Sequence, residues 1–108
     1  MAGQSKEQRR YQRVRLKPGK WVAVRGGGRT RVHRCTLMGL GGMFLQCSDP
    51  LPVGSVLRFA FEVGAFTVSG TATVRTTCSG GIGLGFISMK TGDRANMYAF
   101  LKSRRSKR

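Results

Sequence analysis

The sequence predicts an all-β fold, a small six-stranded antiparallel barrel with one C-terminal helix and a flexible basic N-terminal arm. Three observations lead to this expectation. Six short segments have strand character and are separated by turn residues. One segment near the end of the chain has helical periodicity. A length of 108 residues allows one hydrophobic core and is too short for two.

We expect residues 1–20 to form the arm, because they are polar and show no hydrophobic period. The barrel and its helix are expected over 21–102, followed by a basic tail at 103–108. The whole chain has 20 Lys and Arg residues against four acids, a formal net charge of +16. Such a charge attracts phosphates, whether of nucleic acid, nucleotides or acidic lipids, or simply keeps the chain soluble.

The six strands are justified in chain order by apolar alternation and by turn residues. They are expected at 21–25, 29–37, 43–47, 56–63, 66–75 and 82–86. The run 26–28 consists of three glycines, which can take the positive φ of a hairpin turn. The clearest period of two lies in 66–75, where the even positions from Phe66 to Val74 are apolar or small and predicted to face inward.

The helix is expected to begin near Thr91, with Thr91 or Ser88 as its cap. Asp93 then lies in the first turn, where a carboxylate suits the positive end of the helix dipole. Apolar residues follow at the i, i+3 and i+4 spacing of a single stripe, namely Met97, Phe100 and Leu101. This stripe predicts that the helix packs over the barrel as a lid.

The titratable residues argue against an enzyme. The four acids are scattered, and the single histidine, His33, lies between Arg31 and Arg34, which disfavour its protonated form. A nucleophile with a base and an orienting group therefore has no obvious place. Three widely spaced cysteines contain no close pair, which argues against a disulfide scaffold or a zinc site. We predict no catalytic residue, no metal and no cofactor.

No charge-free run is long and apolar enough to span a membrane, and the run from Cys35 to Ser48 is also interrupted by Gly39, Gly41 and Gly42. The first residues also lack the apolar stretch of a secretory signal. A cytoplasmic location is therefore expected.

Three parts of the sequence resemble the PilZ domain family. They are the arm segment Arg-Arg-Tyr-Gln-Arg-Val at 9–14, the segment Gly-Gly-Met-Phe-Leu at 41–45 with the Leu-Pro-Val-Gly loop at 51–54, and the segment Gly-Leu-Gly-Phe-Ile at 83–87 before the helix. The resemblance runs from about Arg9 to Leu101. It implies a six-stranded barrel with a C-terminal helix that binds the bacterial second messenger cyclic di-GMP.

The binding signature of this family has two halves, Arg-x-x-x-Arg on the arm and Asp/Asn-x-Ser-x-x-Gly in the barrel. The first half is intact between Arg9 and Arg13. Guanidinium groups match phosphate oxygens and the O6/N7 edge of guanine, so this half suits the ligand. The ligand-binding residues that the resemblance implies are Arg9, Arg10 and Arg13 as a clamp and Gly39, Gly41 and Gly42 as a turn beneath the ligand.

The second half of the signature departs from the pattern. Anchored on the glycine pair at 41–42, it has Leu37 at the Asp/Asn position and Gly39 at the Ser position, and only Gly42 matches. A register one residue earlier reads Thr36, Met38 and Gly41. Neither register supplies an acid or amide for a guanine edge. Each unpaired polar group costs about 1–3 kcal/mol, so two losses weaken binding about a hundredfold.

Three functions follow from these observations. The first is a cyclic di-GMP effector that acts on motility, pili or exopolysaccharide through a downstream protein partner. The second is a degenerate PilZ adaptor that works by protein–protein interaction without the nucleotide. The third is a nucleic-acid binder that grips a phosphate backbone with both basic ends, with Tyr11 and Trp21 as its aromatic candidates.

Overall fold

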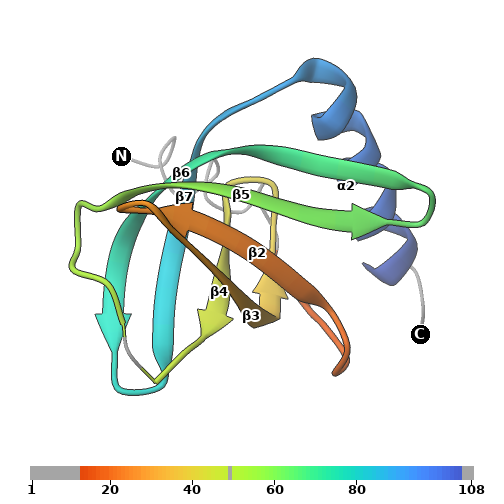
Figure 1. The fold of residues 1–108 in the computed structure, drawn as a ribbon. Helices are drawn as coiled ribbons and strands as arrows, with labels where there is room; N and C mark the ends of the chain where they lie inside the picture. The colour runs from red at the N-terminus through yellow and green to blue at the C-terminus, as the bar shows by residue number, and fades with distance from the viewer. Residues whose placement is uncertain (1–12, 49, 106–108) are drawn as a thin grey trace, which may run out of the picture.

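The computed structural model of the chain describes residues 13–48 and 50–105, which form seven strands and a C-terminal helix (Figure 1). In chain order the elements are β1 (Val14–Arg15), β2 (Trp21–Gly26), β3 (Arg29–Met38), β4 (Gly42–Gln46), β5 (Val56–Val63), β6 (Phe66–Cys78), β7 (Gly81–Met89) and α2 (Thr91–Arg105). All six predicted strands and the predicted helix are present. The seventh strand, β1, was not expected.

Six of the strands close into an antiparallel barrel. Their order is β3-β2-β5-β6-β7-β4, and a further pairing of β4 with β3 closes the ring. β3 is ten residues long and pairs with β2 over its first half and with β4 over its second half. A bulge between Cys35 and Leu37 interrupts the ladder of β3 with β4. The predicted all-β barrel is therefore confirmed.

The last part of the predicted arm is packed against the barrel. β1 pairs with the final two residues of β3, and the Leu16 N–H donates a hydrogen bond to the Thr36 carbonyl at 3.0 Å. Val14 and Leu16 are both buried. The expectation of an arm without regular structure up to residue 20 is thus wrong at Val14 and Arg15, because the side chains of Val14 and Leu16, spaced two apart, reach the core.

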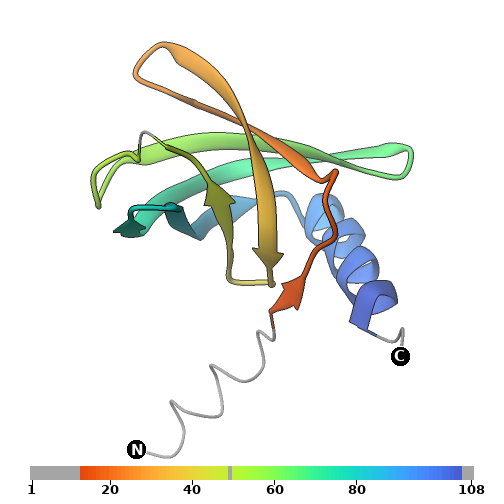
Figure 2. The same ribbon diagram turned by 90° about the horizontal axis from the view of Figure 1, so that it is seen from below.

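The core consists of alternate residues of the barrel strands together with one face of the helix. On β5 the buried residues are Leu57, Phe59 and Phe61, as the period of two predicts. The helix contributes Met97 and Leu101, which are buried at 0% and 5% exposure. α2 contacts β6, β5 and β1 and lies along one side of the barrel opening (Figure 2). The predicted apolar stripe is confirmed.

The hairpin turns show where the sequence pattern succeeds and fails. Gly27 and Gly28 take φ values of 61° and 79°, so the predicted glycine turn is confirmed. Phe66, predicted to face inward, is 58% exposed. It pairs with Val63 beside the β5–β6 turn, at the rim of the barrel, where the inward direction no longer leads to the core.

The three cysteines differ in their exposure to solvent. All three cysteines are free; Cys35 is buried, and burial raises the pKa of its thiol to about 11, whereas Cys78 is exposed.

At the helix start, the Asp93 carboxylate accepts a hydrogen bond from the Ser69 backbone N–H at 3.2 Å and ties α2 to β6. Within the part of the chain that the structure describes, no helix has the length and apolarity needed to cross a bilayer.

His33 provides a test of the packing of β3. Burial, and secondly the nearby Arg31 guanidinium, lower the pKa of His33 below its usual 6.5. The folded chain therefore binds this proton less readily than the unfolded chain, and the free energy of unfolding is expected to fall from about pH 7 to pH 5. Urea unfolding at both pH values should show that His33→Gln reduces this fall. If the free energy of unfolding fell by the same amount in that variant, His33 would not be the source of the pH dependence.

Candidate functional site

The pairing of β1 with β3 brings Arg13, the last residue of the Arg-x-x-x-Arg half of the signature, next to the second half. Val14 pairs with Met38, so the next residues outward on the two strands, Arg13 and Gly39, lie side by side. Arg13 is exposed and Gly39 is buried. Arg9 and Arg10, the other predicted clamp residues, lie outside the described residues.

Three glycines follow one another from Arg13 across neighbouring strands of the barrel. The Gly39 N–H donates a hydrogen bond to the Gly42 carbonyl at 2.9 Å, and Gly42 pairs with Gly85 of β7. The Arg75 guanidinium covers Gly85, because a Cβ atom on this glycine would overlap the Arg75 side chain. We call this row of Arg13, Gly39, Gly42, Gly85 and Arg75 the glycine strip.

Gly41 lies at the edge of the glycine strip, in the turn between β3 and β4. It is exposed, and its carbonyl accepts a hydrogen bond from the Phe86 N–H at 2.9 Å. This bond continues the β4–β7 ladder past Gly42. The structure therefore brings together four of the six predicted site residues: Arg13, Gly39, Gly41 and Gly42.

The close approach of β4 and β7 explains why Gly42 has no side chain. A Cβ atom at Gly42 would overlap the carbonyl oxygen of Leu84 in the facing strand. Since that neighbour is backbone, it cannot rotate away as a flexible side chain could. A bare backbone here also allows a ligand to approach closely.

Arg75 is a site residue that the sequence analysis missed. It belongs to β6, where the pairing with β7 shifts between Val74 and Thr76 and leaves Arg75 out of the ladder. This bulge turns the Arg75 side chain over Gly85. The available signal was the lone arginine at the end of the alternating segment 66–75, but alternation alone does not reveal a bulge.

The structure also distinguishes the two registers in which the second half of the signature, Asp/Asn-x-Ser-x-x-Gly, can be aligned with the sequence. Leu37 pairs with Arg15 of β1 and with Phe44 of β4, and it is half-buried in the row next to the glycine strip. Met38 is fully buried in the core and cannot face a surface ligand. The register with Leu37 and Gly39 therefore has its first position on the outer side of β3, whereas the other register has a core side chain at the Ser position.

The electrostatics of this region favour an anion. β1, β3, β4, β6 and β7 carry no Asp or Glu. The guanidinium groups of Arg13 and Arg75 belong to the two ends of the glycine strip, and the Leu37 and Phe44 side chains lie in the row beside it. In the described part of the chain, no three His, Cys, Asp or Glu side chains could together hold a metal ion. The two guanidinium groups and the absence of acids on these strands suit binding of a phosphate ligand.

Solved structures share this fold. The Bacillus subtilis inhibitor of motility (MotI/DgrA) aligns with 92% of this chain at a TM-score of 0.74 and 19% identity, over 53% of its own length. The PilZ domain of Escherichia coli YcgR, solved with c-di-GMP, aligns with 91% of this chain at a TM-score of 0.71 and 15% identity, over 92% of its own length. Borreliella burgdorferi PlzA, in complex with c-di-GMP, aligns with 93% of this chain at a TM-score of 0.67 and 12% identity, over 43% of its own length.

The likeness to these structures concerns the fold. The chain spans about half the length of the Bacillus protein and less than half of the Borreliella protein. No protein-family model and no curated protein matches the sequence. The chain therefore has the fold of the PilZ domain, as the sequence resemblance predicts.

A substitution at Gly42 tests the close approach of β4 and β7. Gly42→Ala is expected to lower the free energy of unfolding by about 1–3 kcal/mol, since the new methyl group would press on the Leu84 carbonyl. Gly92→Ala is the matched control, because a methyl group at that position, near the start of α2, would have nothing within 4 Å. Urea unfolding compares the two variants. Equal midpoints would contradict the packing described.

Proposed function

We propose that the chain is a cyclic di-GMP-binding effector whose ligand lies on the glycine strip between Arg13 and Arg75. The observation that carries this proposal is the juxtaposition of Arg13 with Gly39, Gly41 and Gly42, the parts of the sequence that resemble the family signature. Two structures with the same fold are described with c-di-GMP, which supports the choice of ligand.

The chemistry of the site fits this ligand class. Cyclic di-GMP carries two phosphates and two guanines, and an arginine can pair with either through two parallel hydrogen bonds. The glycines remove side chains that would hold the ligand away from the backbone. With Arg13 at one end of the strip and Arg75 at the other, each can meet a different part of the ligand.

The substitutions at Leu37 and Gly39 change the expected mode of recognition. Leu37 lies beside Phe44 and offers an apolar surface to a purine ring, but no acceptor for its edge. Gly39 has no hydroxyl to donate. We therefore expect weaker binding than a complete signature would give, with Arg75 supplying part of the missing attraction.

The output of the domain is proposed to pass through a separate protein. Arg9 and Arg10 would close on the bound ligand, and the segment that carries them would then present a new surface. Motility, pili or exopolysaccharide production are the outputs that the resemblance implies. The Bacillus structure with the same fold is described as an inhibitor of motility, which favours the first of these.

The two arginines of the strip are the first test. Arg13→Ala and Arg75→Ala are each expected to weaken cyclic di-GMP binding about 10- to 150-fold, because each removes a charge-assisted hydrogen-bond donor. Arg94→Ala, on the exposed surface of α2, removes one charge elsewhere and should leave the affinity unchanged. Calorimetric titration of each folded variant, with GTP as a control ligand, measures this. Equal weak heat from cyclic di-GMP and GTP would mean charge attraction only and would favour the adaptor function.

Restoring the signature is the second test. The double variant Leu37→Asp, Gly39→Ser is expected to bind cyclic di-GMP more tightly, by up to about a hundredfold, since it returns two partners for the guanine edge. The same calorimetric titration measures the gain, and circular dichroism checks the fold. A folded double variant with no gain would show that the departure at these positions does not limit binding.

A further inference from the structure

A second basic surface lies on the outer face of the barrel formed by β2, β3 and β5. Arg25 of β2 and Arg58 of β5 are directly opposite each other in adjacent strands, and both are exposed. Like charges in this position repel and destabilise the sheet. An anion bound between them would relieve the repulsion.

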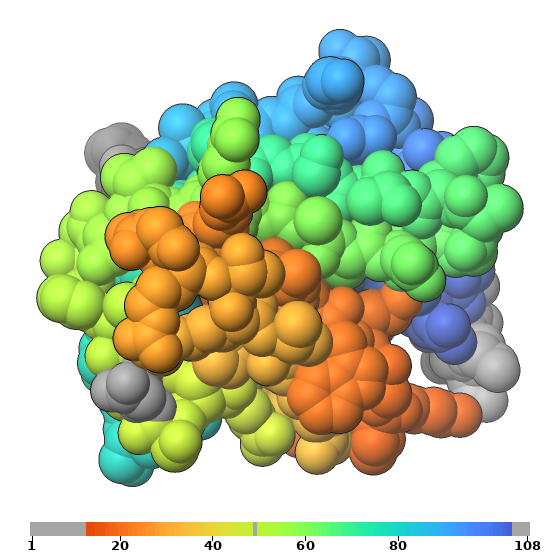
Figure 3. Space-filling model, viewed as in Figure 1, coloured from red at the N-terminus to blue at the C-terminus, as the bar shows by residue number. Residues whose placement is uncertain are grey.

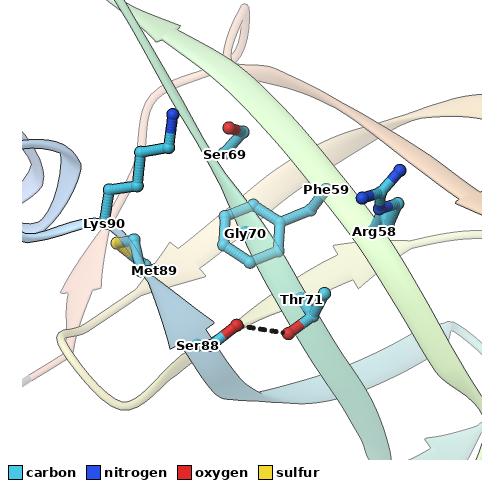
Figure 4. Close-up of a pocket in the computed structure, with 8 residues that line it drawn as sticks. All are labelled: Arg58, Phe59, Ser69, Gly70, Thr71, Ser88, Met89 and Lys90. Carbon is cyan, nitrogen blue, oxygen red and sulfur yellow. Dashed lines mark hydrogen bonds between the residues drawn. The ribbon is translucent and has the colours of Figure 1, made fainter.

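The surface continues from Arg58 into a pocket on β5, β6 and β7. Figure 4 shows Arg58 and Lys90 on opposite sides of this pocket, with the side chains of Ser69, Thr71 and Ser88 between them. The Thr71 and Ser88 hydroxyls are 2.8 Å apart and hydrogen-bonded. The pocket therefore offers two cations and several hydroxyl groups to the same ligand, which is a suitable environment for a phosphate group.

An exposed aromatic side chain and a pair of small side chains lie on the same face. Trp21 begins β2 and is 55% exposed. Ala23 follows two residues later on the same side of the strand and pairs with Ala60 of β5, so small side chains separate Trp21 from the arginine pair. Arg34 lies opposite Trp21 on β3, and its enclosed Nε atom has no hydrogen-bond partner among the described residues.

The charge on this face is nearly all of one sign. β2 and β3 contain four arginines and no acid, and the tip of their hairpin stands clear of the barrel (Figure 2). Glu62, near the end of β5, is the one carboxylate on β2, β3, β5, β6 and β7. In Figure 3 the side chains of β2 and β3 (orange) lie next to those of β5 (green) on the surface facing the viewer.

We propose that this face, defined by Trp21, Arg25, Arg34, Arg58 and Lys90, binds single-stranded nucleic acid. Unpaired bases can stack on Trp21 and lie over Ala23 and Ala60, while phosphates meet the arginine pair and the pocket beside it. A duplex hides the faces of its bases and would leave the exposed indole unused. The proposal does not depend on cyclic di-GMP binding, because the face shares no residue with the glycine strip.

Trp21 makes the test direct, because it is the only tryptophan in the chain. An oligo(dT) of about 15 nucleotides should quench its fluorescence and bind in an anisotropy titration of the 108-residue protein. Trp21→Ala should weaken binding roughly 5- to 150-fold, the loss of one stacked base, whereas Trp21→Phe should keep most of the affinity. The slope of log K against log salt concentration is negative, and Arg25→Ala with Arg58→Ala should make it less steep by about 1.4.

The matched control is Lys102→Ala with Arg104→Ala, which removes the same charge from α2, outside the five residues that define the face. This variant should bind the oligonucleotide as the parent does, and the Arg25, Arg58 variant should keep its affinity for cyclic di-GMP. Equal losses in the two charge variants would reduce the effect to net charge and overturn the proposal. Unchanged binding by Trp21→Ala would do the same, as would binding to phosphatidylserine-rich vesicles without binding to the oligonucleotide.

Discussion

The pairing of one long strand with three others determines the rest of the structure. β3 pairs with β2 along its first half and with β4 and β1 along its second half. The bulge between Cys35 and Leu37 lies within the β3–β4 ladder, at the level where the neighbour on the other edge of β3 changes from β2 to β1, and an extra residue at such a point bends the strand. The barrel closes through β3, which supplies Arg34 to the second basic face, and Gly39 of the glycine strip follows directly after its last residue.

Local patterns in the sequence were sufficient for most of the fold. Six strands and the helix follow from alternation, turn residues and one apolar stripe, each of which depends on neighbouring residues. β1 was missed because two residues carry too little pattern; it exists only because Val14 and Leu16 find a place in the core beside β3. Phe66 was misplaced because alternation gives the side of a strand but not where the core ends.

The binding residues were predictable to the extent that they lie in short motifs. The arginines of the arm and the glycines at 39–42 are recognisable by spacing, although only the resemblance to a family joined them. Arg75 depends on a bulge in β6, and the pair of Arg25 with Arg58 depends on β2 lying next to β5. Neither the bulge nor this strand order has a signal within a few residues, so both required the three-dimensional structure.

The two surfaces are joined by the short segment between Arg13 and Trp21, and Lys20 fixes this segment near its end. The Lys20 ammonium donates a hydrogen bond to the Glu62 carbonyl at 2.6 Å and lies 4.8 Å from the centre of the Phe100 ring. The Lys20 carbonyl accepts a hydrogen bond from the Cys35 N–H at 2.9 Å. These contacts hold the chain between the two surfaces to β3, β5 and α2 directly before Trp21.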